Sequence, residues 1–273
     1  MPELPEVETV CSYICKTFKG EEIVSAEVFR FDLRIGTSVP QDFVKRVTGT
    51  KITDVCRRGK YILVHLSSEE IMTVHLGMTG RFIAHDHSYK RAKHDHIILY
   101  FKGGKCLVFS DTRRFGMVDL APAKIALERL AFMGAEPLSD DFNPASFLQK
   151  IKGRKVPIKQ ALLNQEIVAG LGNIYVCEAL FEAGISPLRA AEKITLQEAE
   201  KLVPIIKNIL QKSIAAGGTT FRDYRSAEGK KGAFVNSLLV YGKEGEKCVN
   251  CGHKIVKIMQ GGRGTFFCEK CQK

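Results

Sequence analysis

Three features that other classes of protein need are missing from this chain of 273 residues. No uninterrupted apolar stretch approaches the roughly 20 residues that a membrane-spanning helix requires. The first residues include Glu3, Glu6 and Glu8, whereas a signal peptide begins with basic residues. The chain has no internal repeat and no low-complexity tract, and its 45% apolar content excludes a disordered or fibrous protein. We expect a globular, cytoplasmic protein with no membrane-spanning segment.

Cysteine is present, but in a number that does not suit a disulfide framework. The chain has nine cysteines, whereas small disulfide-bonded secreted domains normally carry an even number. Five of them are scattered among apolar neighbours, as small hydrophobic residues are: Cys11, Cys15, Cys56, Cys106 and Cys177. Both observations indicate a reducing compartment.

Acidic residues are too few to balance the basic ones. Lysine and arginine number 41 against 30 aspartate and glutamate residues, which gives a formal net charge of +11. The excess is concentrated in residues 201–273, which contain 14 basic and 5 acidic side chains. Because such a surface attracts polyanions, we expect a nucleic acid or an anionic membrane surface as partner, with phosphate bound chiefly by the C-terminal quarter.

The first half of the chain combines one helix with short strands. Apolar residues recur at helical spacing from about Glu6 to Phe18, and Gly20 marks the end of that helix. β-rich runs at 22–29, 61–66, 71–76 and 96–101 then alternate with turn residues, and a Gly-Gly pair at 103–104 indicates a tight hairpin. This spacing predicts an antiparallel β-sandwich or barrel over residues 1–134.

Helical patterns dominate the second half. They cover residues 145–151, 158–165, 174–183 and 196–215, and the last begins with a capping box formed by Thr195 and Glu198. The fold class is therefore α+β. We expect an N-terminal domain at 1–134, a linker at 135–142, a helical domain at 143–240 and a small terminal unit at 241–273.

Four cysteines near the C-terminus have the spacing of a metal site. Cys248 and Cys251 form one CxxC pair, and Cys268 and Cys271 form a second pair after sixteen intervening residues. Four thiolates at this spacing suit tetrahedral zinc, and they leave no coordination position open. We predict one structural zinc ion in preference to disulfides or unpaired thiols.

The segment between the two cysteine pairs predicts a hairpin. Two apolar runs flank Gly261 and Gly262, which places Arg263 at the turn. An arginine at the tip of a rigid hairpin is suited to contact phosphate, although a solvated turn residue explains the same spacing.

The N-terminus offers a nucleophile. If Met1 is removed, Pro2 has a secondary amine with a pKa of about 8, so part of it is unprotonated at neutral pH. Such an amine can attack a sugar C1′ atom and form an iminium. Glu3 beside it and Glu6 on the first helical turn have carboxyl groups that can move a proton or hold the amine in place. A frayed N-terminal arm is the alternative interpretation.

Seven motifs occur in order along the whole chain, and together they resemble bacterial formamidopyrimidine-DNA glycosylases. The motifs are MPELPEVET at 1–9, RRGKY at 57–61, HLGMTG at 75–80, DTRRFG at 111–116, GLGNIY at 170–175, GGTT at 217–220 and the terminal CxxC pairs. The resemblance implies a bifunctional DNA glycosylase and abasic-site lyase of base excision repair. Such an enzyme excises 8-oxoguanine and formamidopyrimidines and then nicks the strand by β- and δ-elimination. The expected partner is double-stranded DNA that contains oxidised purines or abasic sites, and not a membrane. A monomer is expected to bind it in the bacterial cytoplasm, at the nucleoid.

The resemblance also assigns roles to individual residues. In the catalytic group, Pro2 is the nucleophile, Glu3 transfers protons, and Lys60 and Arg263 bind phosphates of the target nucleotide. Residues that fill the gap left by the everted nucleotide, or that otherwise contact DNA, are Met78, Arg113, Phe115, Asn173, His75, His94 and Arg154. The stretch 217–234 corresponds to a loop that closes over the everted purine. Met78, Arg113 and Phe115 are called the wedge residues below. Extrusion of the target base needs side chains of this kind because unstacking a base costs a few kcal/mol.

Several of these positions also have simpler explanations. Met78 and Phe115 suit a hydrophobic core, Lys60 suits a solvated strand end, and Asn173 suits a helix N-cap. His94 and His96 share one strand face, for which we favour hydrogen bonding over a second metal site. Cys11 and Cys177 stand where related sequences commonly carry polar residues.

Two rival functions remain open from the sequence. One is a pyrimidine-damage glycosylase of the endonuclease VIII type, which shares the proline-glutamate start and the zinc hairpin. The other is a lesion-binding protein without catalysis, against which Pro2, Glu3 and Lys60 argue.

Overall fold

The computed structural model describes residues 2–34, 38–219 and 232–273, which form two compact units. The first unit contains Met1–Ala131 together with Ala216–Ala233, and the second contains Phe132–Ala215 with Phe234–Lys273. This division differs from the expected linker at 135–142. Ala135 pairs with Val168 in a parallel β-bridge, and Phe142 is only 1% exposed, so this segment packs into the second unit.

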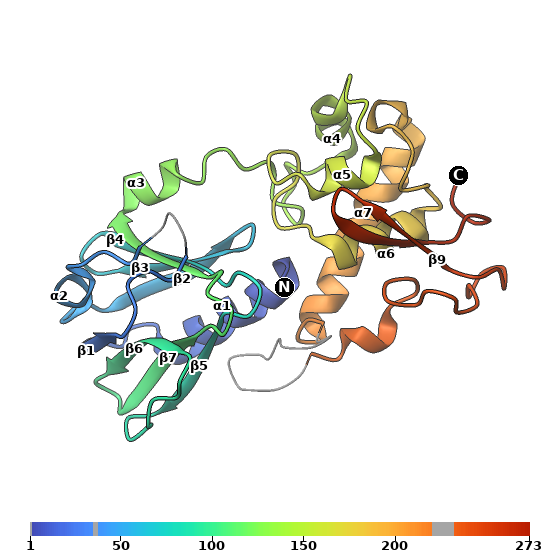
Figure 1. Ribbon diagram of the computed structural model, residues 1–273. Coiled ribbons are helices and arrows are strands. Elements are labelled where there is room, and N and C mark those ends of the chain that lie inside the picture. Colours follow the sequence, from blue (N-terminus) through green and yellow to red (C-terminus); the bar gives the residue numbers. More distant parts are fainter. Residues whose placement is uncertain (1, 35–37, 220–231) are drawn as a thin grey trace. The chain divides into compact units, whose positions relative to one another are not determined.

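The first unit is an antiparallel β-sandwich with one long helix (Figure 1). One sheet has the order β1-β6-β7-β5, and the other has the order β2-β3-β4-β8. The strands are β1 (Ile23–Val28), β2 (Ile52–Arg58), β3 (Tyr61–Leu66), β4 (Glu70–His75), β5 (Arg81–Asp86), β6 (Asp95–Phe101), β7 (Lys105–Ser110) and β8 (Met117–Pro122). The expected α+β class and the hairpin at Gly103 and Gly104, which joins β6 to β7, are confirmed.

The core of this unit lies between the two sheets. Alternate residues of β3, β4 and β8 face it, as the period of two in a strand requires. Helix α1 (Leu4–Phe18) contributes Val7, Val10, Ile14 and Phe18. It begins two residues before the expected Glu6, because Pro5 suits the first helical turn and Glu6 accepts a hydrogen bond from the Glu3 backbone.

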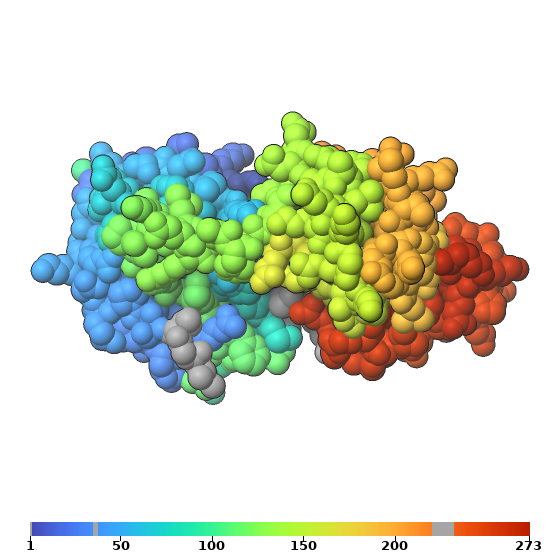
Figure 2. All heavy atoms as spheres, turned by 90° about the horizontal axis from the view of Figure 1, so that it is seen from above, coloured from blue at the N-terminus to red at the C-terminus, as the bar shows by residue number. Residues whose placement is uncertain are grey.

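Two short helices complete the first unit. They are α2 (Phe43–Val47) and α3 (Ala123–Glu128). Helix α3 follows β8 directly and packs on β4 and β8. It is the light green segment on the surface of this unit in Figures 1 and 2. It therefore covers the face of the second sheet that points away from the sandwich core.

The second unit is helical and ends in a two-stranded hairpin. Its helices are α4 (Pro144–Ile151), α5 (Ile158–Leu163), α6 (Asn173–Ala183) and α7 (Leu196–Ala215), with 3-10 turns at Ala191–Lys193 and Phe234–Ser237. Strands β9 (Val256–Gln260) and β10 (Arg263–Phe267) form the hairpin. Thr195 and Glu198 form the expected capping box of α7. Among the described residues, no helix combines the length and the apolar character needed to span a membrane.

Candidate active site and nucleic-acid interface

The N-terminal residues are buried and held by one carboxylate. Pro2 is buried, Glu3 is 3% exposed and Glu6 is 1% exposed. Glu6 Oε2 accepts a hydrogen bond of 2.8 Å from the Glu3 backbone N–H, and Glu6 Oε1 accepts one of 2.6 Å from the Thr219 backbone N–H. Glu6 thus fixes the backbone next to Pro2 and ties it to the segment that follows α7. The alternative interpretation of these residues as a frayed N-terminal arm is therefore wrong.

Lys60 lies in a braced turn between β2 and β3. Arg57 donates from Nε to Glu8 of α1 at 2.7 Å and from Nη1 to the carbonyl of Gly59 at 3.0 Å. Lys60 itself is only 8% exposed. A solvated strand end is therefore the wrong description of Lys60, because the turn holds its side chain inside the unit.

His75 is a neutral, oriented imidazole. Its Nδ1 accepts a hydrogen bond of 3.0 Å from the Gly77 backbone N–H, which places the ring proton on Nε2. Burial, together with the positive charges of Lys60 and Arg34, lowers the pKa of His75 to about 4. Its ring also contacts the Tyr61 ring, with centroids 4.9 Å apart. His75 consequently supports the turn that carries Met78.

One buried carboxylate organises the two turns that carry the expected wedge residues. Asp111 is 1% exposed and accepts hydrogen bonds from the Thr79 hydroxyl, from Arg113 N–H at 3.2 Å and from Gly116 N–H at 2.7 Å. The Thr79 hydroxyl in turn accepts from Arg113 N–H at 3.1 Å. Turn 75–80 and turn 111–116 are therefore linked by side chains.

The backbones of the same two turns also touch. A Cβ atom added to Gly77, whose φ is +61°, would lie 2.4 Å from the carbonyl carbon of Phe115. Met78 and Phe115 are 37% and 44% exposed, and the Arg113 guanidinium lies 5.0 Å from the Phe115 ring centroid. The three residues therefore stand on adjoining turns at the surface, and the expectation that Met78 and Phe115 suit the core is wrong.

His94 and His96 have different environments. His96 is 5% exposed, and its Nε2 lies 2.7 Å from the carbonyl of Asp111. The carbonyl of His94 accepts from Asp111 N–H at 3.0 Å, while its side chain is half-buried. The favoured hydrogen-bonding role fits His96, and the His94 ring stays available for a DNA contact.

Asn173 connects helix α6 to the hairpin. Its Nδ2 donates to the carbonyl of Gly264 at 2.9 Å, and Lys159 donates to the same carbonyl at 3.2 Å and to the Thr265 hydroxyl at 2.7 Å. Gly172, and not Asn173, occupies the N-cap position. The buried Oδ1 of Asn173 has no hydrogen-bond partner among the described residues. The amide therefore stands at the N-terminus of α6, the end of a helix at which a phosphate can bind.

The hairpin presents Arg263 as the spacing predicted. Gly261 and Gly262 have φ values of +57° and +72°, as a two-residue hairpin turn requires, and Arg263 follows them at an exposed position. Below the turn, the buried Gln260 side chain donates to the carbonyl of Pro187 at 3.0 Å and accepts from the Thr265 hydroxyl at 3.1 Å. The arginine thus stands on a hairpin that is fixed to the rest of its unit.

The four terminal cysteines converge. Their Sγ atoms all lie within 4.8 Å of one another, with Cys248 and Cys271 at 3.8 Å and Cys251 and Cys268 at 3.5 Å. Zinc with four Zn–S bonds of about 2.3 Å needs Sγ atoms about 3.8 Å apart. The cluster fits one structural zinc ion. Cys177 packs against it with Phe181 of α6, which explains why an apolar residue suits position 177.

Glu178 anchors the start of the zinc-binding segment, a role that sequence reasoning missed. The side chain is 2% exposed and accepts backbone N–H bonds from Leu239, Val240 and Tyr241 at 2.7, 3.0 and 2.7 Å. Burial raises the pKa of Glu178 despite these donors. A lone glutamate in the apolar run VCEALF was the available signal.

The remaining expected residues lie at three separate places. Arg154 is exposed after α4, with its Nε bound to the carbonyl of Lys150 at 2.8 Å. Cys11 is buried, and its thiol contacts the carbonyl of Cys56 at 3.5 Å. The expected purine-closing stretch 217–234 has its residues 220–231 outside the described part of the chain.

Comparison with protein families accounts for nearly the whole chain. The family model of the formamidopyrimidine-DNA glycosylase N-terminal domain matches residues 1–118, and that of the formamidopyrimidine-DNA glycosylase H2TH domain matches 133–225. The zinc finger found in FPG and IleRS matches 245–273.

Individual relatives agree with these models. The chain is 45% identical to formamidopyrimidine-DNA glycosylase from Ruegeria sp. (strain TM1040) and 44% identical to that from Ruegeria pomeroyi, with all of each chain covered. Among solved structures it is similar to a Lactococcus lactis FPG mutant in complex with Fapy-dG containing DNA. It is equally similar to the Lactococcus lactis Fpg in complex with abasic-site containing DNA. Both give a TM-score of 0.93, 37% identity and full coverage of both chains.

Proposed function

The chain belongs to the formamidopyrimidine-DNA glycosylase family, and we propose that it excises 8-oxoguanine and formamidopyrimidines through a Schiff base on Pro2. The abasic strand is then cut by β- and δ-elimination. Support for the substrate class comes from the Lactococcus lactis relative, which was captured with Fapy-dG DNA and with abasic DNA. We further propose that the enzyme acts as a monomer in the bacterial cytoplasm.

The first chemical step joins enzyme to sugar. The unprotonated amine of Pro2 attacks C1′, and the bond from C1′ to the base breaks as the base leaves. The departing base takes up a proton from water. The N–H proton of the attached Pro2 nitrogen passes to the Glu3 carboxylate, which donates it to O4′ as the sugar ring opens, and the nitrogen becomes an iminium. Loss of a C2′ proton expels the 3′ phosphate, and a second elimination expels the 5′ phosphate. Hydrolysis of the iminium restores the amine.

One observation carries this proposal: the Glu6 carboxylate holds the backbone next to Pro2. Both of its oxygens are used, one by Glu3 N–H and one by Thr219 N–H, and the residue is 1% exposed. A nucleophile must be presented in a fixed direction because misplacement by about 1 Å costs rate heavily. A disordered N-terminus would have no such anchor.

Phosphate binding is assigned to groups in both units. We propose that Lys60 and Arg263 bind phosphates of the target nucleotide and that Asn173 binds one with the N-terminus of α6. His75, His94 and Arg154 are assigned to further DNA contacts. The lysine and arginine contacts contribute the salt-dependent part of affinity, because each releases counterions from the duplex.

We propose that the side chains of Met78, Arg113 and Phe115 fill the gap left by the everted nucleotide. Their exposure on two turns linked by Asp111 supports this role. Inserting apolar side chains offsets the few kcal/mol that unstacking a base costs.

Borohydride trapping tests the nucleophile. Wild-type protein with 8-oxoguanine duplex should give a covalent complex after reduction, and peptide mapping should place the DNA on Pro2. A chain that retains Met1 should give none, because its Pro2 nitrogen is then an amide. Glu3→Gln should trap on a pre-formed abasic site far better than it excises 8-oxoguanine. Mapping of the DNA to Lys60 would refute the mechanism while leaving the family assignment intact.

Substrate choice needs a separate assay. Excision from duplexes with 8-oxoguanine opposite cytosine should exceed excision from duplexes with 5-hydroxyuracil opposite guanine. The reverse preference would favour the pyrimidine-damage activity of the endonuclease VIII type.

A further inference from the structure

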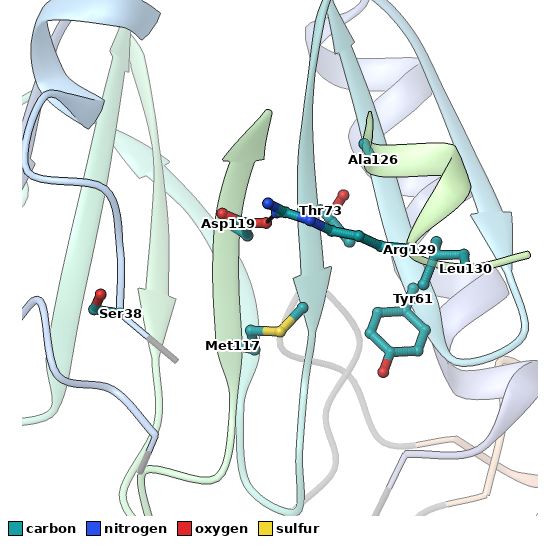
Figure 3. Close-up of a pocket in the computed structure, with 8 residues that line it drawn as sticks. All are labelled: Ser38, Tyr61, Thr73, Met117, Asp119, Ala126, Arg129 and Leu130. Carbon is teal, nitrogen blue, oxygen red and sulfur yellow. Dashed lines mark hydrogen bonds and ion pairs between the residues drawn. The ribbon is translucent and has the colours of Figure 1, made fainter. Parts of the chain in front are cut away.

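A cavity of about 330 Å³ lies in the first unit, and its described lining residues include neither Pro2 nor Met78, Arg113 or Phe115. It is lined by Ser38, Tyr61, Thr73, Met117, Asp119, Ala126, Arg129 and Leu130 (Figure 3). Its volume falls at the lower end of the range for small-molecule sites.

The strand register explains why the cavity exists. Tyr61 of β3, His75 of β4 and Met117 of β8 form one cross-strand row, and Leu63, Thr73 and Asp119 form the next. Residues of a row point to the same face, and this face is opposite to the one that carries the sandwich core. Helix α3 covers it only in part, and Ala126 of the helix and Leu130, just beyond its end, line the cavity.

The lining is apolar, with hydroxyl groups and no net charge. Met117, Ala126 and Leu130 supply aliphatic surface, and Tyr61 supplies an aromatic ring. Arg129 reaches across the strand that carries Thr73 and pairs with Asp119, so the two charges neutralise each other (Figure 3). Among the described residues that line the cavity, no other side chain is charged.

Thr73 indicates that a polar ligand group is accommodated. The residue is 5% exposed, yet among the described residues its hydroxyl has no hydrogen-bond partner. Its oxygen is not one of the fully buried, unpartnered polar atoms of the described residues, so it is open to the cavity, where water or a ligand group can bind it. This hydroxyl borders the cavity.

We propose that the cavity binds a neutral, planar heteroaromatic molecule of purine size. Its ring stacks on Tyr61 and contacts Met117 and Leu130, while an edge nitrogen or oxygen bonds the Thr73 hydroxyl. Aromatic stacking and thioether contact favour a polarisable ring over an aliphatic ligand.

Two contacts connect this cavity to the wedge turns. Tyr61 lies against His75, which accepts the Gly77 N–H at the base of the Met78 turn. Met117 is the cross-strand partner of His75 and follows Phe115 by two residues. A ligand that moves Tyr61 or Met117 therefore alters base extrusion, an effect that rests on the proposed function.

Binding is tested without DNA, on the full zinc-loaded chain, with hypoxanthine as the probe. The six methionines permit methyl labelling, and the Met117 methyl resonance should shift in a saturable manner while that of Met259 stays constant. Leu130→Trp should fill the cavity and abolish the shift, and Thr73→Val should weaken binding at least fivefold. Leu188→Trp, at an exposed position of the other unit, is the matched control and should bind normally.

Each outcome decides the proposal. The absence of a saturable Met117 shift would overturn the proposal, and so would unchanged hypoxanthine binding by a folded Leu130→Trp variant. If Leu130→Trp fails to fold, unchanged hypoxanthine binding by Thr73→Val would overturn it instead. Inosine monophosphate should bind more weakly than hypoxanthine, and tighter binding would contradict the neutral site. Hypoxanthine should slow 8-oxoguanine excision at least threefold with little effect on abasic nicking, and Leu130→Trp should remove this effect. Because the binding measurement needs no excision, failure of the proposed function leaves it interpretable.

Discussion

Replacing Asp111 by alanine tests whether the two wedge turns depend on one carboxylate. The substitution removes the acceptor for the Thr79 hydroxyl and for the N–H groups of Arg113 and Gly116. The turns should separate, and the side chains of Met78 and Phe115 should lose their common position.

The magnitude follows from the exposure of the three donors. A hydrogen bond to a charged group contributes about 1.5–3 kcal/mol, and a donor left buried costs a similar amount. Gly116 N–H is buried, whereas Thr79 and Arg113 lie at part-exposed or exposed positions where water can replace the carboxylate. We therefore expect the free energy of unfolding to fall by about 2–4 kcal/mol, which lowers Tm by roughly 6–12 °C for a unit of this size.

Urea unfolding and two activity assays check the result. Excision of 8-oxoguanine by Asp111→Ala should fall much further than nicking of abasic duplex, because only excision requires a base to be extruded. Asp111→Asn keeps one acceptor oxygen and should be intermediate, and Thr79→Ser, which keeps the hydroxyl, should resemble wild type. A fully stable Asp111→Ala variant, or equal losses on both substrates at a temperature where it is folded, would refute the reasoning.

Three further predictions concern zinc, salt and pH. Chelating zinc should abolish DNA binding while far-UV circular dichroism changes little, because the ribbon is a small terminal unit; full DNA affinity after zinc removal would contradict this. Arg263→Ala should weaken binding to any duplex and reduce the slope of log affinity against log salt by about one unit; an unchanged slope would remove Arg263 from the interface. The pKa of His75 is about 4 in the folded chain, against an ordinary value of 6.5. Between pH 6.5 and pH 4, His75 is therefore protonated in the unfolded chain but neutral in the folded chain. Stability should decline by at most about 3 kcal/mol across that window. His75→Gln should flatten the decline, as measured by urea unfolding at each pH.

The architecture was predictable where local patterns decide it. Apolar periodicity placed α1 and α7, and turn glycines placed the hairpins at Gly103 and Gly261. The order of strands was not predictable, because it depends on pairs such as Ile23 with Phe101 that no local pattern relates.

The site was predictable from motifs only in part. The chemistry-bearing residues occur within short motifs, whereas their supports are distant in sequence. Glu6 accepts from Thr219 across 213 positions, and Lys159 reaches Thr265 across 106. Asn173 sits one residue inside its helix because Gly172 occupies the cap position. Burial of Lys60 and Glu178 likewise depends on tertiary packing, which composition does not encode.

The contact between Gly77 and the Phe115 backbone limits how this enzyme can be redesigned. A chimera that receives turn 75–80 from another protein needs a glycine at position 77, where a Cβ atom would clash with the Phe115 backbone, and a hydroxyl at position 79 that can donate to Asp111. A donor turn that lacks either feature should give a poorly folded hybrid. Turns 75–80 and 111–116 should therefore be exchanged together. Directed-evolution libraries aimed at new lesions should vary Met78, Arg113 and Phe115. They should keep Gly77, Thr79 and Asp111 unchanged.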